Sequence, residues 1–154
     1  MIRFYIPKFE DLWFRQQLLE DPETMSYNHA YGGTIDFPEN RWEAWYSKWI
    51  ADTGEKRWYR YLQSEDGCFV GEAALHFDDD RGIWIADILI AASCRGKGFG
   101  RAALEMLCKE AGKAGITELY DDIAIDNPAV GMFLKAGFTE DCRTDEYIML
   151  KKTL

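Results

Sequence analysis

The sequence predicts one α/β (α+β) domain over residues 1–154, built on a mixed, mostly antiparallel sheet of six or seven strands with helices on both faces. Between residues 58 and 90, apolar strands alternate with short polar turns, which is typical of antiparallel hairpins. After Ile90 the pattern changes to helix, strand, helix and strand, an order that extends the same sheet and covers it. A chain of 154 residues, 47% of them apolar, can bury one core, and no linker or repeat divides it.

The N-terminal third favours a strand, a helix, a loop and a second helix, in that order. Residues 2–6 alternate weakly as in a short strand, and residues 8–20 have apolar side chains at helical spacing. Residues 25–37 contain Gly32 and Gly33 and are expected to form a loop. Pro38 suits a helix start, and the aromatic residues after it recur with helical spacing, which favours core packing over an aromatic substrate wall: Trp42, Trp45, Tyr46 and Trp49.

The remaining elements follow from apolar runs and the turns between them. Strands are expected at residues 58–62, 68–77, 83–90, 116–125 and 147–150. Polar turns at 64–67 and 78–82 join the first three of these strands, and the aspartates of the second turn are expected to face solvent. A helix is expected at 102–113, which has one apolar side.

The composition argues against several classes of protein. The formal net charge of −9 argues against a nucleic-acid partner, because phosphate binding needs a basic surface. The same charge is compatible with a cationic amine as partner, although solubility alone also explains it. No apolar run is long enough to span a membrane, and the first residues lack the pattern of a signal peptide. With no C-x-x-C pair and only two histidines, no metal site is expected, and free thiols favour the cytoplasm.

A glycine-rich loop between the strand at 83–90 and the helix at 102–113 is the most informative segment. Glycines allow backbone N–H groups to converge without an intervening Cβ, and the helix start adds partial positive charge. Three cations in the loop add further charge, so the segment predicts a diphosphate-binding site. Its residues are Arg95, Gly96, Lys97, Gly98, Phe99, Gly100 and Arg101.

Other interpretations of this loop fit less well. The P-loop pattern is absent, because no Gly-Lys-Ser/Thr closes the motif. Gly98, Gly100 and Ala103 match a loose dinucleotide fingerprint, and Glu118 lies where a ribose-binding acid would. However, the preceding strands are expected to be antiparallel, and the remaining residues are too few for a doubly wound sheet. A glycine-rich loop that only turns the chain is the other alternative.

The pattern Arg95-x-x-Gly98-x-Gly100, after an apolar strand and before a helix, resembles the pyrophosphate-binding motif of the GNAT superfamily of N-acetyltransferases. The segment from Asp126 to Phe138 is similar to the family's second motif, a helix that ends in Gly-Phe. The resemblance covers residues 69–150, and the order of elements before it agrees. It implies an acetyltransferase that uses acetyl-CoA as co-substrate, with a small-molecule or peptide amine as acceptor.

The resemblance also implies where acetyl-CoA binds. Its pantetheine arm is expected in a V-shaped gap between the fourth and fifth strands. A bulge near Ile88, Leu89 and Ile90 would free backbone N–H groups there. These groups would hold the thioester carbonyl and polarise it while the amine attacks directly.

The second motif departs from the family at two positions. The usual helix-start asparagine falls on Asp126, with Asn127 one place later. Either side chain could cap the helix, and Asn127 is expected to make any contact with CoA. Phe133 stands where many members have an acid tyrosine. Its ring is expected to pack beside the pantetheine sulfur, with a core residue of the helix as the alternative.

The acceptor needs a base, because an alkylammonium has a pKa of about 10 and must lose a proton before it attacks. Glu72 and Asp87 are the carboxylates on strands near the expected gap, so they are the candidate catalytic residues. A structural role for each, or a chain of waters as the base, is the alternative. His76 titrates in a useful range, but it borders a turn and is expected far from the gap.

Two classes of function remain open from the sequence. The first is an enzyme that acetylates an amine. The second is a module that binds acyl-CoA without catalysis, which Phe133 in place of tyrosine favours. The acceptor is not identified, and a homodimer is left open. In this family the loop at 25–37 often covers the acceptor site; here it carries Tyr27, His29 and Tyr31, although a plain surface loop is the simpler interpretation.

Overall fold

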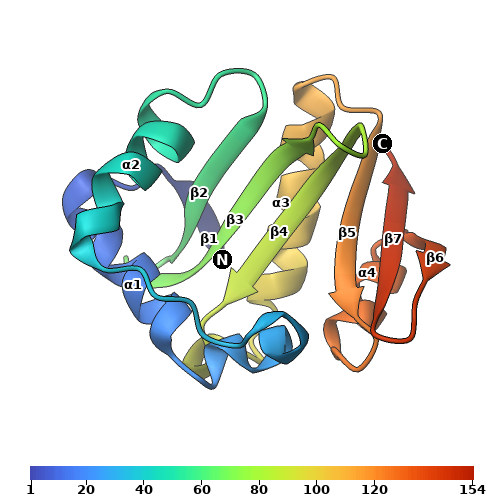
Figure 1. Ribbon diagram of the computed structural model, residues 1–154, viewed down its shortest axis with the longest axis horizontal. Helices are drawn as coiled ribbons and strands as arrows, with labels where there is room; N and C mark the ends of the chain where they lie inside the picture. The colour runs from blue at the N-terminus through green and yellow to red at the C-terminus, as the bar shows by residue number, and fades with distance from the viewer.

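The computed structural model describes the backbone of residues 1–154 and every side chain except those of residues 30 and 31. Its strands form a seven-stranded sheet in the order β1-β2-β3-β4-β5-β7-β6 (Figure 1). The first four strands pair antiparallel: β1 (Ile2–Tyr5), β2 (Arg57–Ser64), β3 (Phe69–Asp78) and β4 (Ile83–Ile90). The last three also pair antiparallel: β5 (Glu118–Ala124), β7 (Tyr147–Thr153) and β6 (Thr139–Arg143). The predicted fold class, a mixed and mostly antiparallel sheet, is confirmed.

The two halves of the sheet meet at one short parallel contact between β4 and β5. The paired residues are Trp84 with Leu119 and Ile85 with Tyr120. Beyond this contact the two strands diverge, as Figure 1 shows. An opening in the sheet is therefore built into the backbone.

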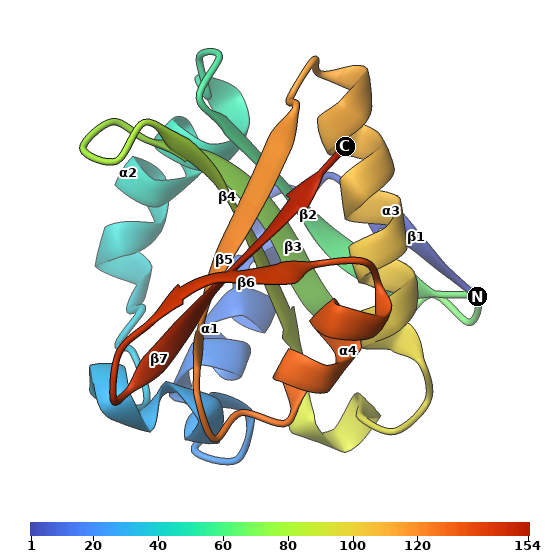
Figure 2. The same cartoon turned by 90° about the vertical axis from the view of Figure 1, so that its right-hand side faces the viewer.

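Helices cover both faces of the sheet (Figure 2). On one face lie α1 (Leu12–Glu20) and α2 (Trp42–Tyr46), and on the other lie α3 (Phe99–Lys113) and α4 (Ala129–Lys135). In the part of the chain that the structure describes, no helix combines the length and the apolar character needed to cross a membrane.

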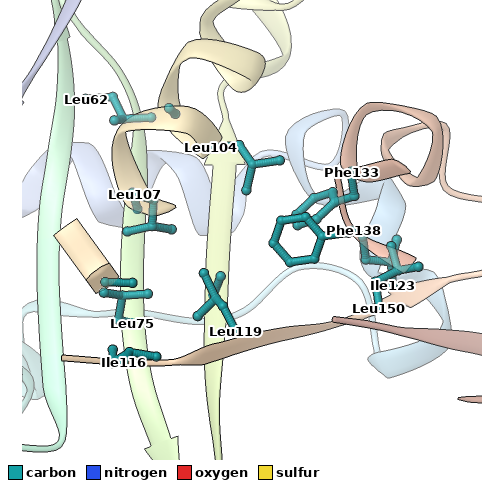
Figure 3. Packing of buried hydrophobic residues seen from close by; sticks show 14 of the residues in the cluster. Leu62, Leu75, Leu104, Leu107, Ile116, Leu119, Ile123, Phe133, Phe138 and Leu150 are labelled. Atoms are coloured by element: carbon teal, nitrogen blue, oxygen red, sulfur yellow. The ribbon is translucent and has the colours of Figure 1, made fainter. Parts of the chain in front are cut away.

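The larger core lies between the sheet and the pair α3 and α4 (Figure 3). Leu104 and Leu107 of α3 have helical spacing that turns both toward the sheet, where they share a buried cluster with Leu119 of β5. Phe133 of α4 packs edge-to-face on Phe138, with ring centroids 5.0 Å apart. This packing fixes α4 beside the opening.

A second, more aromatic core lies under α1 and α2. Leu12 of α1 and Tyr61 of β2 are fully buried in it. Of the aromatic stripe after Pro38, Trp42 is buried, as the core interpretation predicts. Trp45 and Trp49 are only half-buried and line the cavity described below, so the core interpretation holds in part.

Several local elements differ from the sequence expectation. The segment η2 (Thr24–Tyr31) is a 3₁₀ helix where the sequence predicts a loop. The helix after Pro38 is divided into a 3₁₀ turn (Glu39–Arg41), α2 and a π turn, η4 (Ser47–Ala51). Gly98 has a left-handed conformation directly before α3, so this helix begins at Phe99 rather than at residue 102. The strand β6 is not predicted, because all of its residues are exposed and it has no apolar period.

Candidate functional site

A cavity of about 840 Å³ lies where β4 and β5 diverge. It is lined from the α3–α4 face by the glycine-rich loop and the start of α4, and from the α1–α2 face by aromatic side chains. The cavity therefore passes through the opening in the sheet. Five carboxylates line it: Asp126 lies just before α4, and the other four, named here the acidic wall, lie on strands β3, β4 and β5: Glu72, Asp87, Asp121 and Asp122.

The edge of β4 offers backbone donors to this cavity. Hydrogen bonds alternate along an antiparallel ladder, and the bond from the Ala91 N–H to the Val70 carbonyl, at 2.9 Å, sets the phase between β3 and β4. By that alternation the N–H of Leu89 faces β3, whereas the N–H groups of Ile88 and Ile90 face the side of β5. Because pairing with β5 stops earlier along β4, these two groups border the opening.

The predicted bulge at residues 88–90 is wrong. The register between β3 and β4 is continuous along the whole of β4. Gly71 permits this close approach, because a Cβ at that position would collide with the carbonyl oxygen of Leu89. Divergence of the strands, rather than an inserted residue, exposes the donors of Ile88 and Ile90.

The glycine-rich loop has the conformation that the sequence suggests. Gly96 and Gly98 have φ values of 79° and 83°, which glycine adopts without strain. Gly98 leads directly into α3, so the first N–H groups of this helix face the loop. Within the loop only Gly100 is crowded, since a Cβ there would lie 3.3 Å from Sδ of Met132. At Gly98 the nearest atom would be 4.0 Å away, so the backbone conformation is the constraint.

The three cations of the loop have different surroundings. The guanidinium of Arg95 donates to the carbonyl oxygens of Glu23 and Thr24, at 3.3 and 2.7 Å. Arg101 lines the cavity and also bonds to a glutamate one turn later in α3. Lys97 is exposed and does not line the cavity. Arg95 therefore ties the loop to η2, a role that the sequence does not predict.

The start of α4 forms another part of the lining. Asn127 Oδ1 accepts the N–H of Ala129 at 2.9 Å, so Asn127 caps the helix. Asp126 Oδ2 lies 3.0 Å from Nε2 of His29 and connects this loop to η2. Phe133 is 3% exposed and belongs both to the core and to the cavity lining.

Glu72, one of the two predicted bases, is held in an ion pair. Arg15 Nη1 lies 3.0 and 2.8 Å from its two oxygens, and the Tyr59 hydroxyl donates to it as well. The guanidinium of Arg15 lies 4.4 Å from the ring centre of Trp45. Burial, the largest single effect, lowers the pKa of Arg15, but the charges and hydrogen bonds of Glu72 and Tyr59 together outweigh it, so the pKa is raised. The oxygens of Glu72 are therefore already engaged.

The prediction that His76 lies far from the gap is wrong. Its Nδ1 lies 3.0 Å from Oδ2 of Asp87, the second predicted base, which lines the cavity. His76 pairs with Ile85 across the ladder, which puts it on the same face of the sheet as Asp87. The contact with Asp87 raises the pKa of His76, although burial of the ring opposes the shift.

Asp121 is a cavity residue that the sequence analysis does not single out. It follows Tyr120, the last residue of β5 that pairs with β4. Burial raises the pKa of its carboxyl well above the usual value, the charges of Asp87 and Asp122 add to the effect, and the Asp122 N–H opposes it. No cationic side chain among those described contacts it. The sequence signal is weak: an acid inside a partly apolar strand.

Tyr27 of η2 lines the same cavity as the acidic wall. Burial raises the pKa of its hydroxyl, and the charges of Glu72, Asp87 and Asp121 raise it further. Tyr27 and these three carboxylates line one cavity. Tyr31, also expected in this covering segment, has a side chain outside the described residues.

In the described part of the chain, no group of three or more His, Cys, Asp or Glu side chains is arranged to hold a metal ion. All four cysteines are free thiols.

Comparison with known proteins points to one family. Residues 10–138 match the family model described as the acetyltransferase (GNAT) family. No curated protein sequence is significantly similar to the chain.

Solved structures share the whole fold. A spermidine N-acetyltransferase from Vibrio cholerae, in complex with CoA and spermine, has a TM-score of 0.82 at 20% identity, over 99% of this chain and 95% of that chain. An N-acetyltransferase from Staphylococcus aureus Mu50 has a TM-score of 0.78 at 20% identity, over 99% and 97%. PaiA N-acetyltransferase from Thermoplasma acidophilum, in complex with coenzyme A, has 0.71 at 16% identity, over 100% and 99%. At these identities the likeness is evidence of fold.

Proposed function

The chain belongs to the GNAT acetyltransferase family, and we propose that it transfers the acetyl group of acetyl-CoA to a small cationic primary amine. Acetyl-CoA is the co-substrate of the family and of this chain. One observation carries the proposal: a single cavity joins the glycine-rich loop to the acidic wall through the opening between β4 and β5. The first end suits a diphosphate, and the second suits an ammonium group.

The residues around the loop fit CoA. The N–H groups of the loop and of the α3 start would bind the diphosphate, and Arg101 adds positive charge. Arg95 and Lys97 were both predicted to bind the cofactor. They contribute positive charge around the loop rather than a specific contact with the diphosphate. Asn127 uses its Oδ1 to cap α4, which leaves its amide N–H groups as donors toward CoA. The ring of Phe133 supplies part of the apolar wall.

In the proposed reaction the amine attacks the thioester carbonyl directly. Charge that develops on the carbonyl oxygen meets the N–H groups of Ile88 and Ile90, which are held in place because β4 is fixed in the sheet. The C–S bond then breaks. A thiol has a pKa of about 8.5 by analogy with cysteine, so CoA leaves without much help from an acid. Phe133 in place of tyrosine is compatible with turnover for this reason.

The acidic wall supports a cationic acceptor. Asp87 and Asp121 attract an ammonium group, and Tyr27, Trp45 and Trp49 offer aromatic faces to an alkylammonium chain. The Vibrio cholerae neighbour was solved with spermine, so diamines and polyamines are the first acceptors to test. Of the two bases predicted from the sequence, Asp87 is the better candidate, because Glu72 is already bound by Arg15.

Release of free CoA thiol in the presence of an amine panel tests the proposal. We expect saturable release with diamines and polyamines, a rate that rises through neutral pH as the acceptor loses its proton, and an acetylated product by mass spectrometry. No release with any amine, while calorimetry still detects CoA binding, would contradict the proposal and support the module that binds acyl-CoA without catalysis. Loss of CoA binding as well would reject the site itself.

A further inference from the structure

We propose that Asp121 is the general base that accepts the proton of the acceptor ammonium, an inference that rests on the proposed function. Its position is the first support. The pairing of β4 with β5 ends at Ile85 and Tyr120, so Asp121 is the first residue of β5 inside the opening, and it lines the cavity. It therefore lies at the vertex of the same opening whose β4 edge supplies N–H groups to the thioester.

The second support is the set of side chains that contact each carboxylate. Glu72 is bound by a guanidinium and a hydroxyl. Oδ2 of Asp87 lies 3.0 Å from Nδ1 of the His76 imidazole. Among the described side chains no cation contacts Asp121, and only a neighbouring backbone N–H stabilises its charged form. Its oxygens are the ones left to take a proton.

The surroundings of Asp121 favour its protonated form. Burial is the largest cause of its raised pKa, followed by the charges of Asp87 on β4 and of Asp122 beside it. The facing residue on β7 is the apolar Leu150. Tyr27 of η2 lines the same cavity, and its hydroxyl stays neutral because burial raises its pKa. A carboxylate whose pKa is shifted toward neutrality accepts a proton from an ammonium more readily than an ordinary one.

An arginine, and a histidine that is a cation only when protonated, moderate this field. Arg81 Nη1 lies 2.8 Å from Asp122, and His76 lies 3.0 Å from Asp87. Each reduces the negative charge beside Asp121 without contacting it. Protonation of His76 therefore lowers the proton affinity of Asp121, and its deprotonation raises that affinity.

Two protons leave the acceptor nitrogen during the proposed reaction. An N–H bond of the ammonium breaks, and its proton forms an O–H bond on the carboxylate of Asp121. The freed lone pair forms the C–N bond with the thioester carbon, and the C–S bond breaks. The second proton of the amine nitrogen goes to the leaving thiolate, which departs as CoA thiol. Asp121 returns its proton to water at the cavity mouth.

Asp121→Asn tests the assignment, with Glu118→Gln as a matched control. Glu118 is an exposed acid on the same strand and does not line this cavity. We expect Asp121→Asn to lower kcat by about 10²- to 10⁴-fold with an unchanged Kd for CoA, and to recover with an amine of low pKa that needs no base. Asp87→Asn removes one of the charges that raise the pKa of Asp121, so it should move the acidic limb of the pH–rate profile to lower pH. An Asp121→Asn enzyme with wild-type rate and profile would overturn the inference.

Two measurements do not depend on turnover. Removing the charge of a half-buried carboxylate that no described cation contacts should raise the melting temperature of Asp121→Asn, whereas loss of a structural carboxylate would lower it. Carboxyl carbon NMR of the wild type should show Asp121 titrating above the other aspartates, and an ordinary titration would overturn the assignment even in an active enzyme. Absence of acetylation by the wild type with every amine would instead overturn the proposed function.

Discussion

Nδ1 of His76 lies 3.0 Å from Oδ2 of Asp87, and the contact joins β3 to β4 at the wall of the cavity. Both side chains are partly exposed, at 33% and 54%. The contact therefore links a group that titrates near neutrality to the acidic wall, and its effect on stability depends on pH.

The stabilising effect of this contact should be present at low pH and absent at high pH. The Asp87 contact raises the pKa of His76 above its unfolded value of about 6.5. A raised folded pKa adds stability that is complete below the unfolded pKa and is lost as pH rises through the folded pKa. After solvent screening we expect on the order of 1 kcal/mol or less. Urea denaturation of His76→Asn should show the deficit below about pH 6 and not above about pH 9; a deficit of equal size at both would contradict the ionic origin.

The glycines of the loop should matter more for CoA binding than its exposed lysine. Gly98→Ala forces a left-handed φ on alanine, at a cost of roughly 1 kcal/mol, and Gly100→Ala brings a methyl group against Met132. Lys97→Ala removes a screened charge outside the cavity lining. Calorimetry with CoA should show a larger rise in Kd for either glycine variant than for Lys97→Ala, and the reverse order would refute the proposed loop geometry.

Separating Arg15 from Glu72 should destabilise the fold strongly. Their side chains are 16% and 15% exposed, so Arg15→Gln leaves a carboxylate inside the protein without its cation. We expect a loss of about 3–5 kcal/mol in the free energy of unfolding. The double variant Arg15→Met/Glu72→Leu should recover much of it, because neither charge is then left unpaired. Additive losses in this double-mutant cycle would show that the ion pair does not couple the two residues.

Phe133→Tyr separates packing from chemistry in α4. The ring is 3% exposed and packs on Phe138, so the added hydroxyl lacks a partner in the core and should cost about 1–3 kcal/mol of stability, with kcat unchanged. Phe138→Tyr is the matched control, since Phe138 is equally buried but does not line the cavity. A higher kcat or an altered pH–rate profile for Phe133→Tyr alone would put the hydroxyl beside the thioester sulfur.

Most of the fold could be predicted, because apolar periodicity survives wherever an element has one buried face. The strand β4 shows this with apolar residues that face α3, and the helix α3 shows it with apolar residues that face the sheet. The exposed strand β6 could not be found by that route, since it has no buried face. The segment η2 could not be found either, because it is held by hydrogen bonds that Ala92 and Arg95 donate to Thr24, about 70 positions away.

The sequence by itself determined the order of the elements and the glycine-rich loop before α3, since periodicity and glycine conformation are properties of short segments. Only the tertiary structure decided which carboxylates meet in the cavity and what each one contacts. Glu72 is bound by an arginine far along the chain, Asp87 meets His76 through strand register, and Asp121 enters the opening because β5 leaves β4 after Tyr120. These relationships depend on pairing and divergence between distant strands, which no local pattern of residues encodes.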